Sequence, residues 1–182
     1  DRPVDDPIQE FAFRENIDTF RGSCNNVYKR AIEACNYYNF DTFARICGDR
    51  PFLDYKLISK GIKIIKNSNY DLVTSMFPRT YPPGLTTEII KKDLLERFDS
   101  IVLEKFDREH LTTFFYKNPN GINIKNKENL NYDSIKNIRL VIDDNYDLKR
   151  ARWIARKLSD KKFVSIKDII SIALEYEDHT KL

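Results

Sequence analysis

Residues 41–51 read DTFARICGDRP. An apolar-leaning run suited to a β-strand stops there at a glycine, and Pro51 prevents the strand from continuing. The turn leaves Asp49 at the carboxyl edge of the strand, where a carboxylate can hold Mg²⁺ together with substrate phosphates. An aspartate in a turn can also simply bond its own backbone. The stretch alone is compatible with a metal ligand and with a structural turn residue.

Short β-rich runs alternate with amphipathic runs of helical length on either side of this stretch. We expect helices at about 7–16, 27–38, 55–66, 91–98, 107–117, 144–158 and 165–176, and strands at 18–20, 41–47, 70–75, 85–90, 122–126 and 138–142. This order predicts an α/β fold with a mainly parallel sheet, helices on both faces, and an α+β insertion after Pro82-Pro83-Gly84. Ligands of such folds bind at the carboxyl ends of strands, a rule that selects Ser23, Asp49 and Asp143.

Asp143 ends the strand expected at 138–142, and its neighbour Asp144 suits the N-cap of the following helix. Either aspartate can also have a purely structural role as a helix cap. Two carboxylates at strand ends of one parallel sheet can instead converge on one Mg²⁺. The ion would neutralise charge on a triphosphate and polarise its α-phosphorus. Mg²⁺ is therefore the cofactor that these residues favour.

Further polar residues each allow a functional and a structural interpretation. The turn Arg21-Gly22-Ser23 can place amides and a hydroxyl around a base or ribose, but such triplets are common in turns. Arg45, inside a strand, needs a phosphate, a carboxylate or solvent as partner. Arg79 and Tyr81 lie in a stiff proline-rich loop that can hold side chains towards a substrate. His110 can act as an acid or base, or be a hydrogen-bonded structural residue.

The composition fits one soluble globular domain, since the 182 residues are 41% hydrophobic and 32% charged. The net charge is only +3, and we interpret the basic cluster at 149–162 as a solvated helix face rather than a nucleic-acid or membrane patch. Three cysteines without a CxxC pair and only two histidines predict free thiols in a reducing cytoplasm and no Cys/His zinc site. No run is long enough to span a bilayer, and the start does not resemble a secretory signal.

Five motifs follow one another along the chain: FRGS at 20–23, ARICGDRPFLD at 44–54, PRTYPPGL at 78–85 with Glu88, REHLT at 108–112 and IRLVID at 138–143. Their order and spacing resemble the cytidylyltransferase family of spore-coat polysaccharide biosynthesis protein F. That family is related to the CMP-Kdo and CMP-sialic acid synthetases. The resemblance covers nearly the whole chain.

The resemblance implies a Rossmann-like nucleotidyltransferase fold of the nucleotide-diphospho-sugar transferase type, with a sugar-binding and dimerisation subdomain inserted at about 77–137. It implies an enzyme that transfers CMP from CTP to a sugar or sugar acid for cell-surface polysaccharide, with Mg²⁺ and release of pyrophosphate. An acceptor oxygen would attack the α-phosphate in line. A cytoplasmic homodimer is expected, with neither nucleic acid nor membrane as partner.

The resemblance also implies roles for particular residues. Asp49 and Asp143 would be the metal ligands and catalytic residues. Nucleotide contacts would come from Arg21, Gly22, Ser23, Arg45 and Gly48. The acceptor pocket would be lined by Arg79, Tyr81, Glu88, Arg108, Glu109 and His110.

Three departures from the family pattern bear on function. Arg50 stands where the family commonly has cysteine, and Thr86 stands where it commonly has an acidic residue, which leaves the acceptor's identity open. The family begins with a Gly- and basic-rich phosphate loop, and this chain opens at its second βα connection, so we expect one βαβ unit to be lacking. A nucleotidyltransferase for another base and a non-catalytic nucleotide- or sugar-binding remnant stay open as alternatives.

Overall fold

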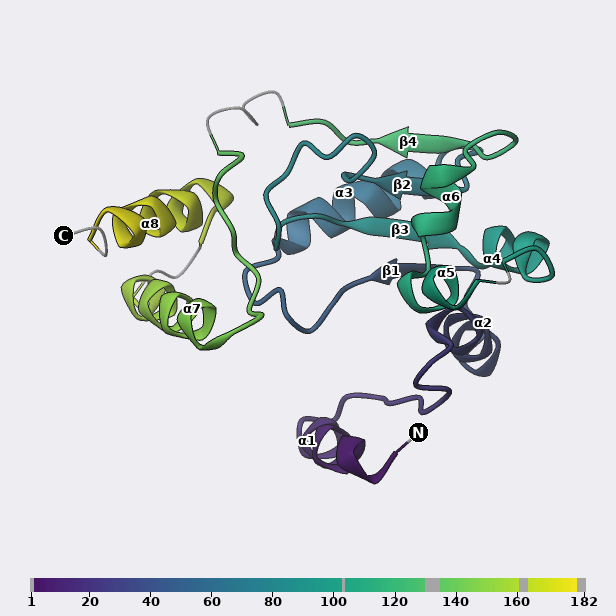
Figure 1. Ribbon diagram of the computed structural model, residues 1–182, viewed down its shortest axis with the longest axis horizontal. Helices are drawn as coiled ribbons and strands as arrows, with labels where there is room; N and C mark the ends of the chain where they lie inside the picture. Colours follow the sequence, from purple (N-terminus) through teal and green to yellow (C-terminus); the bar gives the residue numbers. More distant parts are fainter. Residues whose placement is uncertain (1, 103, 130–134, 161–163, 180–182) are drawn as a thin grey trace. The chain divides into compact units, whose positions relative to one another are not determined.

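The computed structural model describes residues 2–102, 104–129, 135–160 and 164–179. Its elements are η1 (Pro3–Asp5), α1 (Asp6–Arg14), α2 (Val27–Tyr38), β1 (Thr42–Arg45), α3 (Tyr55–Lys66), β2 (Leu72–Thr74), β3 (Glu88–Lys91), α4 (Lys92–Phe98), α5 (Lys105–His110), α6 (Thr113–Lys117), β4 (Ile124–Asn126), α7 (Asn145–Leu158) and α8 (Ile166–His179) (Figure 1). The strands form one sheet in the order β1-β3-β2-β4, in which β2 and β4 are parallel. The expected α/β class is confirmed.

The chain divides into two compact units, and two of the three divisions fall within β1 and β3. One unit contains residues 1–43 and 90–122, and the other contains residues 44–89 and 123–182. The sugar-binding and dimerisation subdomain expected at about 77–137 stays a prediction, and residues 103 and 130–134 of that range lie outside the described part. No helix in the described part of the chain is both long and apolar enough to cross a lipid bilayer.

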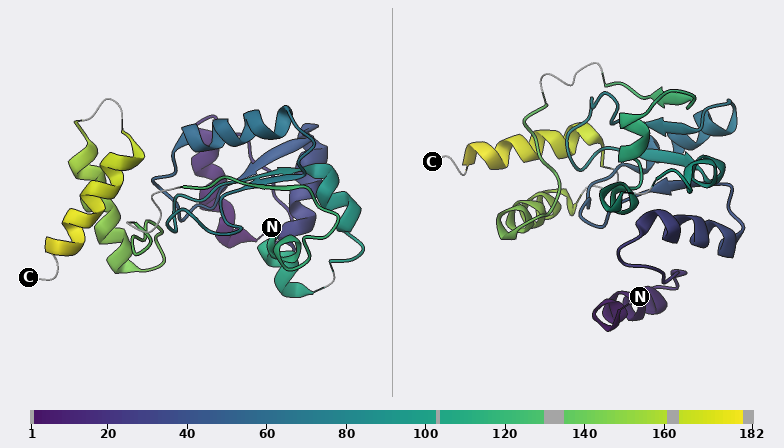
Figure 2. Two further views of the ribbon diagram at one scale, coloured as in Figure 1. Left: turned by 90° about the horizontal axis from the view of Figure 1, so that it is seen from above. Right: turned by 45° about the vertical axis from the view of Figure 1, so that its right-hand side comes forward.

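In the second unit, α3 lies along one face of the sheet (Figure 2). An apolar stripe of the helix packs there. Asp54 caps the helix, because its carboxylate accepts a hydrogen bond from the Lys56 amide at 2.7 Å. The stripe is formed by residues at helical spacing that pack with Val73 and Ile89, namely Ile58, Ile62 and Ile65. A helix was predicted at the bounds observed, since a cap, a periodic stripe and a polar C-terminus all agree there.

The same unit has a second core, in which α7 and α8 lie side by side (Figure 2). Their apolar faces pack with Leu85 and Leu140. The predicted N-cap at Asp144 is confirmed, since its carboxylate accepts from the Asp147 amide at 2.9 Å, while the Asp147 carboxylate accepts from the Asp143 amide. At the start of α8, Ser165 and Asp168 bond each other's amides as a capping box.

The basic cluster at 149–162 is partly a solvated face, since Lys149, Arg152, Arg156 and Lys157 are exposed. The interpretation is wrong for Arg150, which is buried and donates to the Asp147 carboxylate at 2.5 Å. A buried guanidinium needs such a partner. Residues 161 and 162 lie outside the described part.

In the first unit, α2 packs against α4 and α5. Tyr28 on α2 is fully buried, and its hydroxyl donates to the Leu95 carbonyl at 2.7 Å. Its ring lies 6.3 Å from that of Phe115. Phe115, from the aromatic row at 114–116, is fully buried in this core.

Three predicted elements differ from the structure. The strand expected at 18–20 is irregular, and the helix expected at 107–117 is broken into α5 and α6 at Leu111, whose φ is 55°. The strand expected at 138–142 is an irregular segment bonded at two points: the Leu140 amide donates to the Pro83 carbonyl at 2.8 Å and the Ile142 amide to the Asp49 carbonyl at 3.0 Å. Its partners are loop residues, and Pro83 has no N–H to return, so no ladder forms.

Candidate functional site

The turn that follows β1 carries Asp49, and the segment that precedes α7 carries Asp143. The hydrogen bond from the Ile142 amide to the Asp49 carbonyl, 3.0 Å long, joins these two segments. Asp143 is the next residue after this bond. The two predicted metal ligands are therefore held in one region of the second unit, although an irregular segment carries Asp143 in place of the expected strand.

The two carboxylates differ in their surroundings. Asp143 is exposed and paired with Arg139. The Asp49 side chain is 37% exposed, but its Oδ1 is buried and accepts no hydrogen bond from the described residues. A buried acceptor without a donor costs about 1–3 kcal/mol, so such an atom is expected to bind a water or an ion.

The residues present fit Mg²⁺ as the ion. Carboxylate oxygens are the hard ligands that Mg²⁺ prefers, and it commonly takes one or two of them together with waters and substrate phosphates. The described residues contain no group of three or more Asp, Glu, His or Cys able to hold a metal ion. Two carboxylates that are completed by a phosphate-bearing substrate match this arrangement better than a closed protein site does.

Arg50 and Thr86, the two departures from the family pattern, bond to each other. Nη1 of Arg50 donates to the Thr86 carbonyl at 3.1 Å and to its Oγ1 at 2.9 Å. Thr86 is fully buried, and the Arg50 side chain is only 12% exposed. Nε of Arg50 lies 3.9 Å from Oδ1 of Asp49 and has no hydrogen-bond partner among the described residues. Arg50 thus links the segment that precedes β3 to the turn that carries Asp49.

A double-mutant cycle tests this link. We expect Arg50→Met and Thr86→Val to show a coupling free energy of about 1–3 kcal/mol, because the bond involves a charged donor. The free energy of unfolding, measured in urea for both single variants and the double variant, gives the coupling. Strictly additive losses would contradict the contact.

A hollow of about 270 Å³ adjoins this link. Three arginines and one carboxylate line it, together with apolar and backbone groups; the charged residues are Arg50, Arg79, Arg139 and Asp143. The exposed Arg79 guanidinium forms no ion pair with any residue in the described part of the chain. Guanidinium groups recognise phosphates and carboxylates in a planar, two-point manner, so the hollow is suited to an anionic group.

Arg45 and Glu88 bind each other across the neighbouring strands β1 and β3. Nη1 of Arg45 donates to Oε2 of Glu88 at 2.8 Å, and the Glu88 side chain is fully buried. Of the three partners considered for Arg45, the structure provides the carboxylate. The contact of Arg45 with the nucleotide and that of Glu88 with the acceptor stay predictions.

The remaining predicted residues of this unit lie apart from one another. Tyr81 lines a cavity of about 320 Å³, not the hollow that contains Arg79, although only Thr80 separates them. Burial raises the pKa of the Tyr81 phenol. Gly48 is exposed, and a side chain there would meet no atom within 4 Å, so nothing in the structure requires glycine.

In the first unit, Arg21-Gly22-Ser23 is an irregular segment that is held by side-chain hydrogen bonds to neighbouring residues. The Arg21 guanidinium donates to Asp6 at 2.6 Å and to Gln9 at 2.8 Å, and Ser23 Oγ accepts from the Asn26 amide at 3.1 Å. Arg21 also lines a cavity of about 510 Å³. The triplet is thus an irregular segment beside a cavity, and its role towards a nucleotide stays a prediction.

Arg108, Glu109 and His110 lie at the end of α5 in the same unit. Arg108 donates to both the carboxylate and the carbonyl of Asp99, and its guanidinium lies 5.0 Å from the Tyr28 ring centroid. The His110 ring is 4.2 Å from that of Phe106, and Glu109 is exposed. Arg108 therefore has a clear structural role, and acceptor contacts of all three residues stay predictions.

Comparison with known proteins places these features in context. Residues 2–178 match the sequence profile of a family described as cytidylyltransferase. An uncharacterized protein of Methanocaldococcus jannaschii is 33% identical over 145 residues, which are 80% of this chain and 58% of that protein. Spore coat polysaccharide biosynthesis protein SpsF of Bacillus subtilis (strain 168) is 23% identical over 175 residues, 94% of this chain and 71% of that protein.

A solved structure described as a cytidylyltransferase from Leptospira borgpetersenii serovar Hardjo-bovis is also similar. It matches with a TM-score of 0.90 at 28% identity, covering 98% of this chain and 74% of that one. This chain spans 58% of the length of the archaeal relative and 71% of that of SpsF.

Proposed function

The chain belongs to the cytidylyltransferase family, and from that premise we propose that the complete protein transfers CMP from CTP to a sugar or sugar acid and releases pyrophosphate. The name of SpsF supports an acceptor that is used in cell-surface polysaccharide. The observation that carries the proposal is the pairing of the Asp49 turn with the Asp143 segment, together with a buried Asp49 oxygen that accepts no hydrogen bond from the residues the structure describes.

In this proposal Asp49 and Asp143 would hold Mg²⁺, which when bound offsets negative charge on the polyphosphate. Arg50, Arg79 and Arg139 bind and orient anionic groups beside these carboxylates. The acceptor oxygen attacks the α-phosphate, and the bond to the pyrophosphate leaving group breaks. The chain contributes chiefly by holding charged groups in place, which is the main source of catalysis in phosphoryl-type transfer.

Calorimetry on this chain and on the complete protein tests the proposal. We expect CTP to bind in the presence of Mg²⁺, with at least tenfold weaker binding after addition of EDTA, since the carboxylates would otherwise repel the phosphates. ATP, GTP and UTP serve as controls for the base. An equal affinity for UTP would favour a nucleotidyltransferase with another base specificity, and no binding of any nucleotide by the complete protein would refute the proposal.

Turnover is then measured as pyrophosphate release from CTP with a panel of sugars and sugar acids. Nucleotide binding without release for any acceptor would favour a non-catalytic binding protein. The proposed homodimer is checked by sedimentation of the complete protein at micromolar concentration, where a single monomeric species would contradict it.

A further inference from the structure

Lys127, directly after β4, is a buried lysine whose side chain bonds only neutral groups among the described residues. The residue is 7% exposed. Its Nζ donates to the Leu57 carbonyl at 2.9 Å and to Thr87 Oγ1 at 2.7 Å, and both acceptors are neutral. No carboxylate in the described part of the chain forms an ion pair with it. Lysines are almost never this buried unless they are paired, so the charge calls for an explanation.

Within the described part of the chain, the ammonium group of Lys127 has one donor left. It carries three N–H groups, of which two are used by Leu57 and Thr87. Burial lowers the pKa of Lys127 to about 8, and the positive charge of Lys60 acts in the same direction. The group is therefore still mostly protonated at pH 7, and an anion at the third donor would complete its bonds and its charge balance.

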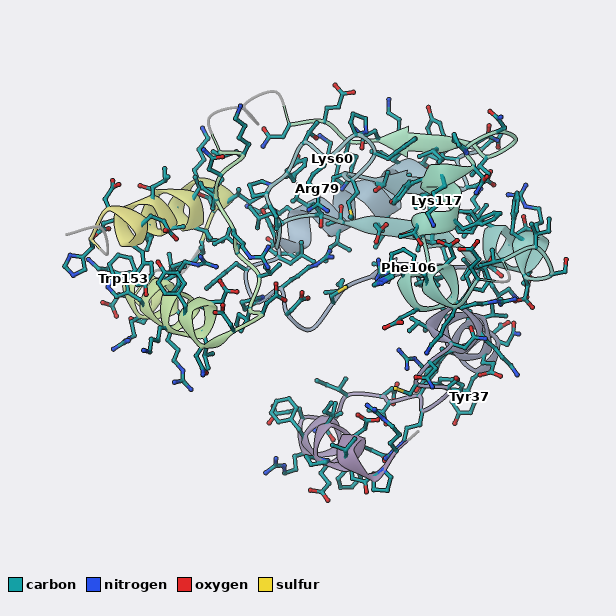
Figure 3. All side chains as sticks on the ribbon, in the orientation of Figure 1. Tyr37, Lys60, Arg79, Phe106, Lys117 and Trp153 are labelled. Carbon is teal, nitrogen blue, oxygen red and sulfur yellow. The ribbon has the colours of Figure 1, made fainter. Side chains whose placement is uncertain are left out.

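Lys127 also borders a cavity. It lines the cavity of about 320 Å³ that also contains Tyr81, and this volume falls in the range of small-molecule sites. The charged residues of the lining are three lysines and one glutamate, namely Lys60, Lys125, Lys127 and Glu128. Lys60 is labelled on α3 in Figure 3. None of the three lysines forms an ion pair with another described residue, so the cavity is positively charged.

The position in the sheet is the one at which ligands bind. β2 and β4 are parallel, with Thr74 opposite Asn126, and Lys127 follows at their carboxyl ends. Its amide donates to the Thr74 carbonyl at 2.7 Å, and its carbonyl accepts from Thr80 Oγ1 at 3.3 Å. These bonds fix Lys127 against the strand end and the proline-rich loop, where open α/β sheets place their ligands.

We propose that this cavity is an anion subsite, in which Lys127 Nζ binds a carboxylate or phosphate group of the acceptor. The site itself stands on the contacts above, and only the naming of the acceptor as its ligand rests on the proposed function. Lys127 would then select an acidic acceptor over a neutral one.

The first test follows the side chain of Lys127 by NMR in lysine-labelled protein, with the signal assigned by its absence in Lys127→Met. The probes are acetate and inorganic phosphate, with sodium chloride at matched ionic strength as the control. We expect saturable shifts with at least one of the two anions, none with chloride, and an upward change of the Lys127 pKa in the bound state. Stronger binding of acetate would indicate a sugar acid, and stronger binding of phosphate a sugar phosphate.

The second test uses variants. Lys127→Met is expected to weaken anion binding about tenfold or more, the usual effect of losing a charged hydrogen bond. Because this variant leaves Leu57 and Thr87 without their donor, Lys60→Gln and Lys125→Gln provide exposed alternatives, with expected losses of about twofold to fourfold each. Lys63→Gln, exposed on the same helix α3 and outside the cavity lining, is the matched control and should bind normally.

The pH dependence has a defined sign. Anion binding requires the protonated amine, so affinity is full below pH 7 and falls as pH rises through about 8. The other charged groups that face the cavity are Lys60, Lys125 and Glu128. Tyr81 also lines the cavity, and burial raises the pKa of its phenol. No anion-dependent change in the Lys127 signal, or unchanged binding in a folded Lys127→Met variant, would overturn the subsite. Mg²⁺-dependent CTP binding, measured on the same samples, separates this result from a failure of the proposed function.

Discussion

Asp49→Asn is expected to abolish Mg²⁺-dependent CTP binding by this chain and to lower CMP transfer by the complete protein about a thousandfold. Asparagine has nearly the same shape, but it replaces one carboxylate oxygen by a donor and removes the negative charge. The backbone bond from the Ile142 amide to the carbonyl of residue 49 stays available, so the fold is expected to persist. Calorimetry gives the binding, and pyrophosphate release gives the rate.

Two neighbouring aspartates make this experiment specific. Asp143→Asn is expected to act in the same direction as Asp49→Asn, because both carboxylates serve the same ion in the proposal. Asp144→Asn removes an equal charge one residue away and is expected to be silent, since Asp144 caps α7 and asparagine caps helices equally well. If Asp49→Asn and Asp144→Asn behaved alike, Asp49 would be only a turn residue.

Local signals explain how much of the fold was predictable. The bounds of α3 follow from its cap at Asp54 and its apolar period, and the caps at Asp144 and Ser165 follow from three-residue spacings. The break between α5 and α6 has no such signal, since Leu111 adopts a positive φ without a glycine or proline nearby. The alternating segment 138–142 is typical of a strand, but its partners are loop residues that the sequence does not identify.

The candidate site, like the fold, combines residues that the sequence selects with contacts that it does not reveal. The strand-end rule and the resemblance both selected Asp49 and Asp143, and one backbone bond joins their segments. The bond between Arg50 and Thr86 and the pair Arg45–Glu88 depend on which segments adjoin, so the sequence alone did not reveal that two family departures contact each other. Lys127 was missed for a similar reason: its burial arises from the parallel pairing of β2 with β4 and from the packing of α3.

Gly84→Ala is expected to destabilise the protein by about 3–5 kcal/mol, through backbone strain and a steric clash together. Gly84 has a φ of +98°, which an L side chain rarely adopts, and an added Cβ would lie 2.4 Å from the Leu140 carbonyl oxygen. Such a loss is a large part of the roughly 5–15 kcal/mol by which domains are stable. Urea unfolding, followed by circular dichroism, measures it.

Substitutions at two other glycines separate the effect of backbone strain from that of the steric clash. Gly121 also has a positive φ, +77°, but an added Cβ would meet no atom within 4 Å, so Gly121→Ala should cost only about 1–2 kcal/mol of strain. Gly48→Ala has neither problem and should change stability by less than about 1 kcal/mol. A Gly84→Ala variant no less stable than Gly121→Ala would show that the proline-rich loop can move away from Leu140. If the loop instead stays in place, the clash is expected to displace the segment that carries Asp143, because Leu140 lies three residues before Asp143. CTP binding by the folded fraction should then fall together with the free energy of unfolding.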